Sequence, residues 1–307
     1  MIVPPGLEER RALGPAWSAW LDRLPRLTKD LLGEWELVAD GAAAHGFVSL
    51  VLPVRTRDGE AAVLKVSFDG DDESEHEALA LQTWHGNGTV RLLRADPRRR
   101  ALLLERLRSE DLGDRWDLEA CEVVGELYGR LHVPAPPQLR TVTSYVERWT
   151  AALQGLPRNA PVPRRLVEQA THLSAALCSD PASTGRLVHG DLHYANVLAA
   201  DREPWLVIDP KAMSGDPHYE PAPMLWNRTD ELAGSPGGLR DGLRRRFHTL
   251  VDTAGLDEDR ARDWVVVRMV LNAHWSVEDA RRADRELTRD ERDWITQCIA
   301  VAKAVQE

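Results

Sequence analysis

The sequence predicts an α+β fold of two lobes, with a small mixed β-sheet and one main helix in residues 1–107 and a larger, mostly helical lobe in residues 108–307. Short apolar runs separated by turn residues fill residues 35–107, which is typical of strands. Beyond residue 118, apolar residues recur mainly at helical spacing. The 307 residues exceed a typical single domain, and a hydrophobic content of 43% is enough for two cores.

Turn signals and periodicity place the elements of the first lobe. Residues 7–24 read as an amphipathic helix that Pro15 interrupts. The R-T-R-D-G sequence at 55–59 predicts a hairpin turn between two strands. A segment with helical periodicity follows and includes Leu79 and Trp84. The predicted strands are Trp35–Val38, Phe47–Val54, Ala61–Val66 and Ala101–Leu107.

In the second lobe, amphipathic periodicity predicts a series of helices around one pair of short strands. The predicted helices are 118–131, 144–153, 163–177, 238–254, 257–283 and 288–305. Two arginine runs, Arg98–Arg100 and Arg244–Arg246, are interpreted as a turn and as a solvated helix face. There are no internal repeats.

The most informative motif is the run H-G-D-L-H-Y-A-N at 189–196, followed by I-D-P at 208–210. Asp191 and Asn196 lie five residues apart, which is the separation of base and metal ligand in a kinase catalytic loop. Asp209 follows another apolar run, Trp205–Ile208, and so reads as a carboxylate at the end of a strand. The pattern indicates phosphoryl transfer.

The residue types fit that chemistry. Mg²⁺ prefers hard oxygen ligands and retains some waters, so the carboxylate of Asp209, the amide oxygen of Asn196 and the phosphates of ATP suffice to bind it. An acceptor hydroxyl must be aimed at the γ-phosphorus while its proton finds a base, and Asp191 on a short loop is suited to both tasks.

A kinase also needs a lysine for the nucleotide phosphates, and Lys65 lies within an apolar strand. Most strand lysines extend to solvent at an edge. Here Glu75 and Glu77 follow in a helical segment, and one of them is expected to pair with Lys65. We favour Glu77, with Glu75 as the alternative.

Two further segments are predicted to bind the nucleotide. The small residues from Gly41 to Gly46 would let backbone N–H groups approach the phosphates, although G-A-A-A-H-G also makes an ordinary turn. The strand that ends at Glu105 and Leu107 occupies the position of the hinge whose backbone binds adenine in kinases. A plain core strand is the alternative.

Two other classes of protein are alternatives to a kinase. A non-catalytic nucleotide-binding protein would be expected to lack at least one of Lys65, Asp191, Asn196 and Asp209, and all four are present. A transition-metal hydrolase could use His189 and His193 beside the aspartates, but it leaves Lys65 without a role.

Composition limits the partners. The net charge of −10 argues against nucleic acid and suits a cationic small molecule, although many enzymes are acidic for solubility alone. No run of eighteen apolar residues occurs and the N-terminus lacks the pattern of a signal peptide, so we expect neither a membrane partner nor export, and a cytoplasmic location. The three cysteines are far apart, without the spacing of a zinc site.

The chain resembles the aminoglycoside phosphotransferases, a superfamily with a protein-kinase-like fold, and most of all the streptomycin 6-phosphotransferase and hydroxyurea-kinase group. One departure is Lys211, where the family often has Glu or Gly after its D-P. The matching segments are V-R-L-L (90–93), A-L-L-L-E-R-L (101–107), L-H-V-P-A-P-P-Q-L-R (131–140), the run Asp191–Pro210, G-D-P (215–217) and N-A-H-W-S-V-E-D (272–279).

This resemblance implies an ATP- and Mg²⁺-dependent kinase that phosphorylates a hydroxyl of a small molecule. Streptomycin or a related aminoglycoside is the best candidate, with antibiotic resistance as the result, and hydroxyurea or another small hydroxylated metabolite is the alternative. In this architecture the acceptor lies between the catalytic loop and the last helices. The residues expected to bind it are Asp216, Glu220, Trp275, Glu278 and Asp279.

Overall fold

The computed structural model describes residues 3–157, 159–234 and 237–306 and divides into two compact units. The first unit comprises Met1–Ser109 and Leu198–Ala212, and the second comprises Glu110–Val197 and Met213–Glu307. The boundary near residue 109 lies close to the predicted lobe boundary at 107. The segment that carries Asp209 belongs to the first unit, whereas the sequence-based division assigned it to the second lobe.

The first unit is built on an antiparallel sheet with the strand order β1-β3-β4-β6-β5, in which β2 also pairs with β3. Arg55 pairs with Ala61 across the predicted hairpin, and Gly59 in its turn has φ of 83°, which glycine adopts without strain. The strands are β1 (Val38–Ala39), β2 (Ala44–His45), β3 (Ser49–Arg55), β4 (Ala61–Ser67), β5 (Leu92–Asp96) and β6 (Ala101–Glu105).

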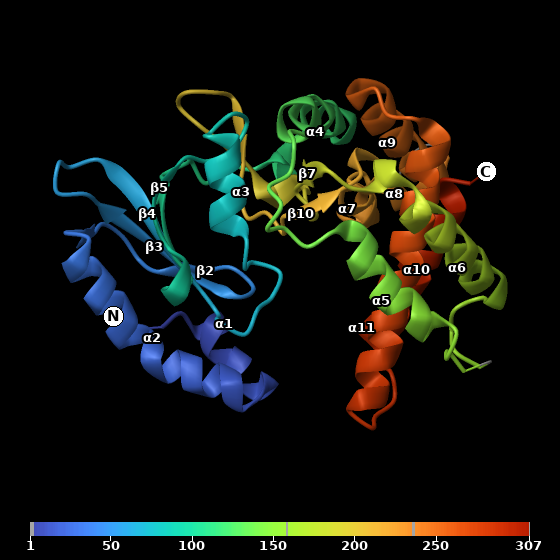
Figure 1. The fold of residues 1–307 in the computed structure, drawn as a ribbon, viewed down its shortest axis with the longest axis horizontal. Helices are drawn as coiled ribbons and strands as arrows, with labels where there is room; N and C mark the ends of the chain where they lie inside the picture. The colour runs from blue at the N-terminus through green and yellow to red at the C-terminus, as the bar shows by residue number, and fades with distance from the viewer. Residues whose placement is uncertain (1–2, 158, 235–236, 307) are drawn as a thin grey trace. The chain divides into compact units, whose positions relative to one another are not determined.

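The N-terminal helices cover one face of this sheet (Figure 1). Leu64 and Val66 of β4 share a buried cluster with Trp20 and Leu24 from α2 (Pro15–Glu34). Successive side chains of a strand point to opposite faces, so Lys65 points away from this core. The remaining helices of the unit are α1 (Pro5–Glu8), α3 (Glu77–Trp84) and the 3₁₀ turns Glu9–Leu13 and Pro97–Arg99.

Two predictions for the first unit need correction. The helix predicted over residues 7–24 is broken at Gly14, and α2 then runs on to Glu34 with Pro15 in its first turn, where a missing N–H costs nothing. Trp35, predicted to begin a strand, is the C-cap of α2, and β1 is confined to Val38–Ala39. The predicted turn over Arg98–Arg100 is confirmed as the 3₁₀ segment Pro97–Arg99.

Four short strands frame the motif residues. β7 (Arg186–Val188) pairs antiparallel with β10 (Met213–Gly215), and β8 (Val197–Ala199) pairs with β9 (Trp205–Val207). Asp191 and Asn196 therefore lie on the loop between β7 and β8, and Asp209 follows β9, as the apolar runs predicted.

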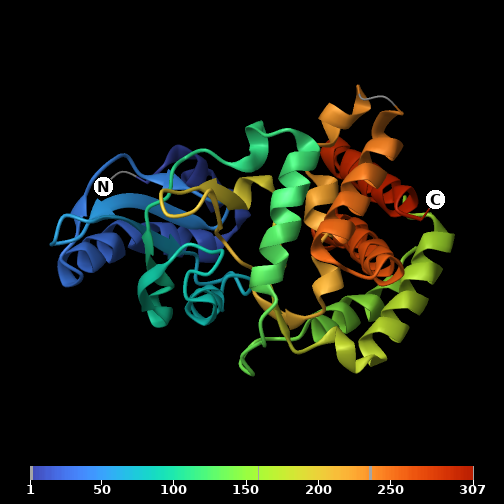
Figure 2. The ribbon, with the colours of Figure 1, turned by 90° about the horizontal axis from the view of Figure 1, so that it is seen from above.

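The second unit is helical, and α10 (Glu258–Arg282) is its central element (Figure 2). Every residue of α10 from Trp264 to His274 is buried, as expected of a helix packed on all sides by α5, α6, α9 and α11. The other helices are α4 (Asp117–Leu131), α5 (Val142–Leu153), α6 (Arg164–Ser179), α7 (Ala222–Trp226), α8 (Thr229–Ala233), α9 (Gly238–Ala254) and α11 (Arg289–Ala304), with 3₁₀ turns at Leu112–Asp114, Pro181–Ser183, Tyr194–Asn196 and Pro217–Tyr219.

Helix boundaries in this unit follow their capping residues. Asp257 accepts the N–H of Arg260 and begins α10, and Thr288 with Glu291 forms a capping box at the start of α11. The six predicted helices are all present, whereas the short α7 and α8 were not predicted. Arg246 was placed on a solvated face, and this is wrong because its side chain is fully buried within α9.

Candidate active site

Lys65 forms a buried ion pair with Glu77, the first residue of α3. Its Nζ lies 2.7 and 2.6 Å from the two carboxylate oxygens of Glu77, while Glu75 is exposed and precedes the helix. Burial by itself lowers the pKa of Lys65, but Asp209 and Glu77 together raise it above the ordinary value. Burial also raises the pKa of Glu77, and Lys65 opposes that effect. The lysine is thus held charged and in one orientation.

Asp209 completes this cluster from the segment after β9. Its Oδ1 lies 2.6 Å from Nζ of Lys65, and its side chain is one third exposed (34%). The residue has φ of 56°, a left-handed conformation that aspartate tolerates better than most side chains and that often marks functional positions. On the same carboxylate, Oδ2 lies 3.8 Å from Nζ of Lys211.

The turn that best matches the predicted phosphate-covering loop is the hairpin tip from His45 to Ser49. β1 and β2 both pair with β3, and at the tip the N–H of Gly46 donates to the carbonyl of Ser49 at 2.9 Å. Gly41 lies outside this tip, between β1 and β2, where its backbone adopts φ of 156° beside Pro53. The two glycines predicted to act together therefore occupy different parts of the hairpin.

At the end of β6, the Glu105 side chain already has hydrogen-bond partners, whereas in the described part of the chain the main chain of Leu107, two residues later, does not. The carboxylate of Glu105 is used structurally, because its Oε1 lies 2.9 Å from Nε of Arg202 and its Oε2 accepts the N–H of Arg91. Within the described ranges, no hydrogen bond is formed to the main chain of Leu107. Main-chain groups of this kind can bind the edge of a nucleotide base.

The loop between β7 and β8 is shaped by its own polar groups. Nδ1 of the fully buried His189 accepts the N–H of Asp191 at 3.2 Å. Nδ2 of Asn196 donates to the carbonyl of Asp191 at 2.9 Å and lies 3.3 Å from Nε2 of His193. With its nitrogen fixed in this way, the amide of Asn196 has Oδ1 available for a metal ion.

Glu220 anchors this loop from outside it. Its Oε1 accepts the N–H of Gly190 at 3.1 Å, and Arg268 of α10 donates to the carbonyl of the same glycine. Burial raises the pKa of Glu220 to about 7, against the hydrogen bonds from the loop backbone and the charge of Arg268. Glu220 was predicted to bind the acceptor, but the structure places it against the loop between β7 and β8, fully buried.

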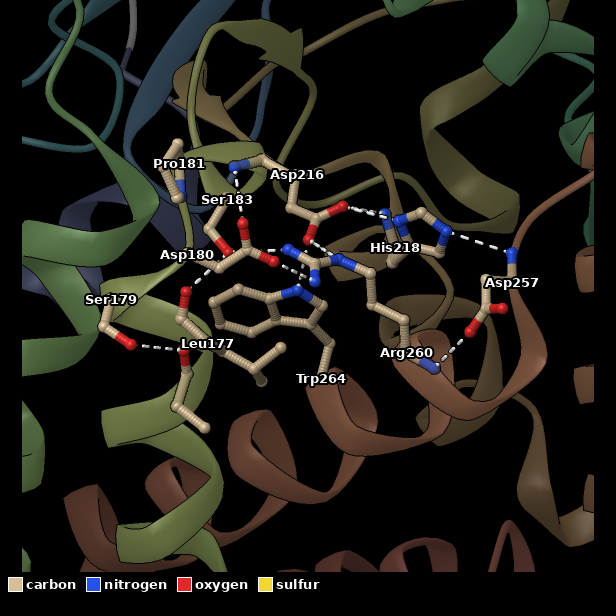
Figure 3. A network of polar contacts seen from close by, with 12 residues as sticks. Leu177, Ser179, Asp180, Pro181, Ser183, Asp216, His218, Asp257, Arg260 and Trp264 are labelled. Carbon is tan, nitrogen blue, oxygen red and sulfur yellow. Dashed lines mark hydrogen bonds and ion pairs between the residues drawn. The ribbon is translucent and has the colours of Figure 1, made fainter.

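Asp216, also predicted to bind the acceptor, lies in a buried polar network (Figure 3). Its carboxylate accepts the indole N–H of Trp264 at 2.7 Å and contacts Nε of Arg260 at 2.5 Å and Nδ1 of His218 at 2.6 Å. Burial tends to raise the pKa of Asp216, but the hydrogen bonds from His218 and Trp264 lower it overall. With these partners the carboxylate joins the start of α10 to the loop after β10, which is a structural role.

Trp275 belongs to an aromatic cluster of α5 and α10. Its ring makes edge-to-face contacts with Tyr145 and Trp149, at centroid distances of 5.8 and 5.7 Å. The indole nitrogens of Trp149 and Trp275 and both ring nitrogens of His274 are buried without a hydrogen-bond partner among the described residues. Buried donors and acceptors without a partner cost free energy unless a ligand or water satisfies them.

The two carboxylates predicted beside Trp275 differ from each other. Glu278 lies 2.9 Å from Arg281 and 3.1 Å from Arg282, and the hydrogen bond from Arg281 lowers the pKa of Glu278 to about 2. Asp279 is exposed. A ligand cation would have to compete with Arg281 and Arg282 for Glu278, so this carboxylate is poorly suited to bind a cationic ligand.

Sequence reasoning missed a second anchor of the loop between β7 and β8. The hydroxyl of Tyr194 donates to Oδ1 of Asp117 at 2.7 Å, and Nε of the buried Arg246 binds the same carboxylate at 2.8 Å. A signal was available, since Leu243, Arg246, Phe247 and Leu250 recur at helical spacing and share a face of α9.

Solved structures share this fold. An aminoglycoside phosphotransferase in complex with ADP and hygromycin B superposes with a TM-score of 0.59 at 18% identity, covering 90% of this chain and 97% of that one. The choline kinase LicA from Streptococcus pneumoniae superposes with a TM-score of 0.61 at 11% identity, covering 93% and 99%. At these identities the likeness establishes the protein-kinase-like fold.

Curated relatives are closer in sequence. A streptomycin 6-kinase from Streptomyces glaucescens is 42% identical over 281 residues, which cover 89% of each protein. A hydroxyurea phosphotransferase from Kitasatospora aureofaciens is 39% identical over 281 residues, covering 88% of this chain and 78% of that protein. Residues 34–280 match the family described as aminoglycoside/hydroxyurea antibiotic resistance kinase. With the kinase motif, the fold and these relatives in agreement, the chain belongs to the aminoglycoside/hydroxyurea antibiotic resistance kinase family.

Proposed function

We propose that this enzyme transfers the γ-phosphoryl group of ATP to a hydroxyl of streptomycin or a closely related aminoglycoside, and so confers resistance. The cluster of Lys65, Glu77 and Asp209 is the observation that carries the ATP-dependent part of the proposal, because it holds a charged lysine against a carboxylate suited to a metal ion. The choice of acceptor is supported by 42% identity over most of the chain to a protein named streptomycin 6-kinase.

The nucleotide-binding roles follow from the chemistry of each residue. Lys65 would bind the α- and β-phosphates, with Glu77 holding it in place. Gly46 would let the main chain of the hairpin tip approach the phosphates, while its own N–H donates to Ser49, and Gly41 would serve only to shape the hairpin. The carbonyl of Glu105 and the main chain of Leu107 would bind adenine, since the Glu105 side chain is already paired with Arg202 and its N–H donates to the carbonyl of Arg91.

The residues present fit a magnesium ion. Asp209 offers a carboxylate and Asn196 offers an amide oxygen, the hard donors that Mg²⁺ prefers while it keeps several waters. When bound, Mg²⁺ would neutralise charge on the phosphates. Asp191 would accept the proton of the acceptor hydroxyl and aim its oxygen at the γ-phosphorus, and His189 and Asn196 hold the backbone of this residue. Since the donor is ATP, we place the enzyme in the cytoplasm.

For the acceptor we propose Trp275, together with Trp149, and Asp279 as a peripheral contact. The unpartnered indole N–H groups of the two tryptophans suit hydroxyl oxygens of an aminoglycoside, and an aromatic face attracts its cationic groups. Glu278 would contribute little beyond its existing pairs with arginine. Asp216 and Glu220 are given structural roles because both are buried in networks of their own.

Hydroxyurea is the second candidate acceptor, because a relative named hydroxyurea phosphotransferase is 39% identical over 281 residues. The two acceptors differ in size and charge, which makes them easy to separate. Purified protein would be incubated with MgATP and either streptomycin or hydroxyurea, and ADP release would be measured beside the mass of the acceptor. We expect ADP release coupled to phosphorylated streptomycin, and phosphorylation of hydroxyurea alone would transfer the proposal to the second acceptor.

A further inference from the structure

Lys211 is a second lysine on the carboxylate of Asp209. Its Nζ lies 3.8 Å from Oδ2, while Nζ of Lys65 lies 2.6 Å from Oδ1, so the two ammonium groups contact different oxygens of one side chain. The Lys211 side chain is only 16% exposed. Its charge also lowers the pKa of the Glu77 carboxyl group, against the effect of burial.

Lysine is rare in this chain, so its presence at position 211 is notable. The sequence has four lysines, Lys29, Lys65, Lys211 and Lys303, among 39 basic residues, and two of the four contact Asp209. Arginine presents a planar fork that suits permanent carboxylate pairs, whereas lysine is a compact, rotatable point charge that can exchange one oxygen partner for another. Lysine at both contacts therefore suits a cluster whose ion pairs must rearrange when a ligand binds.

The charges of the cluster balance before any nucleotide is bound. The carboxylates of Glu77 and Asp209 face the ammonium groups of Lys65 and Lys211. A cation that takes Asp209 as a ligand would compete with both lysines for its oxygens. Lys65 would keep Glu77 as a partner, but the structure shows no second carboxylate within ion-pair distance of Lys211 in the part of the chain that it describes.

From this arrangement we propose that Lys211 is a second phosphate-binding lysine, which leaves Asp209 and donates to non-bridging oxygens of the γ-phosphoryl group. The proposal rests on the proposed function and adds a specific residue to it. In the transfer, the bond from the γ-phosphorus to the bridging oxygen of ADP breaks, and a bond from the acceptor oxygen to phosphorus forms. The hydroxyl proton passes to Asp191, and Lys211 keeps its protons and stabilises the phosphoryl charge.

Nucleotide binding by variants tests this role without relying on turnover. Calorimetric titrations with ADP and with the non-hydrolysable ATP analogue AMP-PNP would be done with Mg²⁺ on wild type, Lys211→Met, Lys65→Met and Lys29→Met. We expect Lys211→Met to weaken AMP-PNP binding by about tenfold and ADP binding by less than about twofold, because only AMP-PNP carries the γ-phosphoryl group. Lys65→Met should weaken both ligands, and Lys29→Met, an exposed lysine of α2, should change neither.

Other results of these titrations would overturn the proposed role of Lys211. Equal weakening of ADP and AMP-PNP in Lys211→Met, or no change in either, would overturn the γ-phosphate role. Circular dichroism would check folding, and Lys211→Gln would replace the methionine variant if that variant failed to melt cooperatively. Wild-type protein that binds neither nucleotide would instead contradict the proposed function itself, so the two failures are distinguishable.

Discussion

The backbone N–H of Gly190 donates a 3.1 Å hydrogen bond to Oε1 of Glu220, so a fully buried carboxylate holds the residue next to Asp191. Burial raises the pKa of Glu220 from 4.5 to about 7. In the unfolded chain this carboxyl ionises near its ordinary value, so between pH 4.5 and 7 the folded protein holds a proton that the unfolded chain has lost. The free energy of unfolding should therefore fall as pH rises through this window.

Glu220→Gln tests this linkage. Glutamine can still accept the N–H of Gly190 but does not titrate, so the variant should lack this part of the pH dependence. Relative to the variant, wild type should lose on the order of 2–3 kcal/mol of unfolding free energy between pH 4.5 and 7. Urea denaturation at several pH values measures the difference, and parallel curves for the two proteins would show that Glu220 has no raised pKa.

The pairing of Lys65 gives a second prediction. Glu77→Gln removes one buried partner of the lysine, leaving Asp209 to hold it, and should lower kcat/KM for ATP by about tenfold or more. Glu75→Gln changes an exposed residue just before α3 and should stay within about twofold of wild type. Steady-state kinetics would be compared with melting curves to separate misfolding from lost positioning. A larger loss in Glu75→Gln than in Glu77→Gln would reverse the assignment.

The buried network of Asp216 gives a third prediction, on stability. Asp216→Asn removes the charge that faces Arg260 and should cost about 3 kcal/mol, seen as a Tm several degrees lower. In Asp216→Asn, KM for the acceptor should not change. The control for stability is Asp279→Asn, at an exposed position, which should leave Tm unchanged. The folded pKa of Asp216 lies below 3.8, so its contribution is present at neutral pH and is lost as pH falls below about 4. A raised KM with an unchanged Tm would restore Asp216 to the acceptor site.

The aromatic cluster gives a fourth prediction. Trp275→Ala should raise KM for streptomycin by about tenfold, because a cation–π contact and an N–H donor are lost together. Trp294→Ala, which removes a partly buried tryptophan of α11, is the matched control and should have little effect. Joint neutralisation of Glu278 and Asp279 should raise KM by less than about threefold, since two arginines already neutralise Glu278. A tenfold effect of that double change would favour an acidic acceptor site.

The contrast between Asp191 and Glu220 shows what the sequence could predict. Asp191, Asn196 and Asp209 stand in a short pattern bounded by apolar runs, and local spacing is enough to suggest their chemistry. Glu220 lies thirty positions beyond Gly190, and only the tertiary fold joins them. Its acidic side chain lies near the motif in sequence and so suggested ligand binding. Closeness in sequence does not reveal that a side chain is buried.

Helices and strands show the same contrast between what local sequence reveals and what only the tertiary fold reveals. Long helices with strong periodicity, such as α9 and α10, were predicted to within about a residue of their observed ends. Trp35 was misassigned because its apolar neighbours suit a strand as well as the end of a helix. Arg246 was misread because a run of three arginines looks solvated, although the third lies on the apolar face of α9 and binds Asp117.

Mass spectrometry of the acceptor decides whether Asp191 directs the transfer of a phosphoryl group from ATP to an acceptor hydroxyl. Wild type with MgATP and streptomycin should yield a product heavier by one phosphoryl group. Asp191→Asn should form that product at least about 10²-fold more slowly, while calorimetry shows unchanged affinity for ATP. Product formation by Asp191→Asn at the wild-type rate would show that Asp191 does not direct the transfer. The lack of a phosphorylated product from streptomycin, related aminoglycosides and hydroxyurea with wild type would show that the protein does not phosphorylate these acceptors.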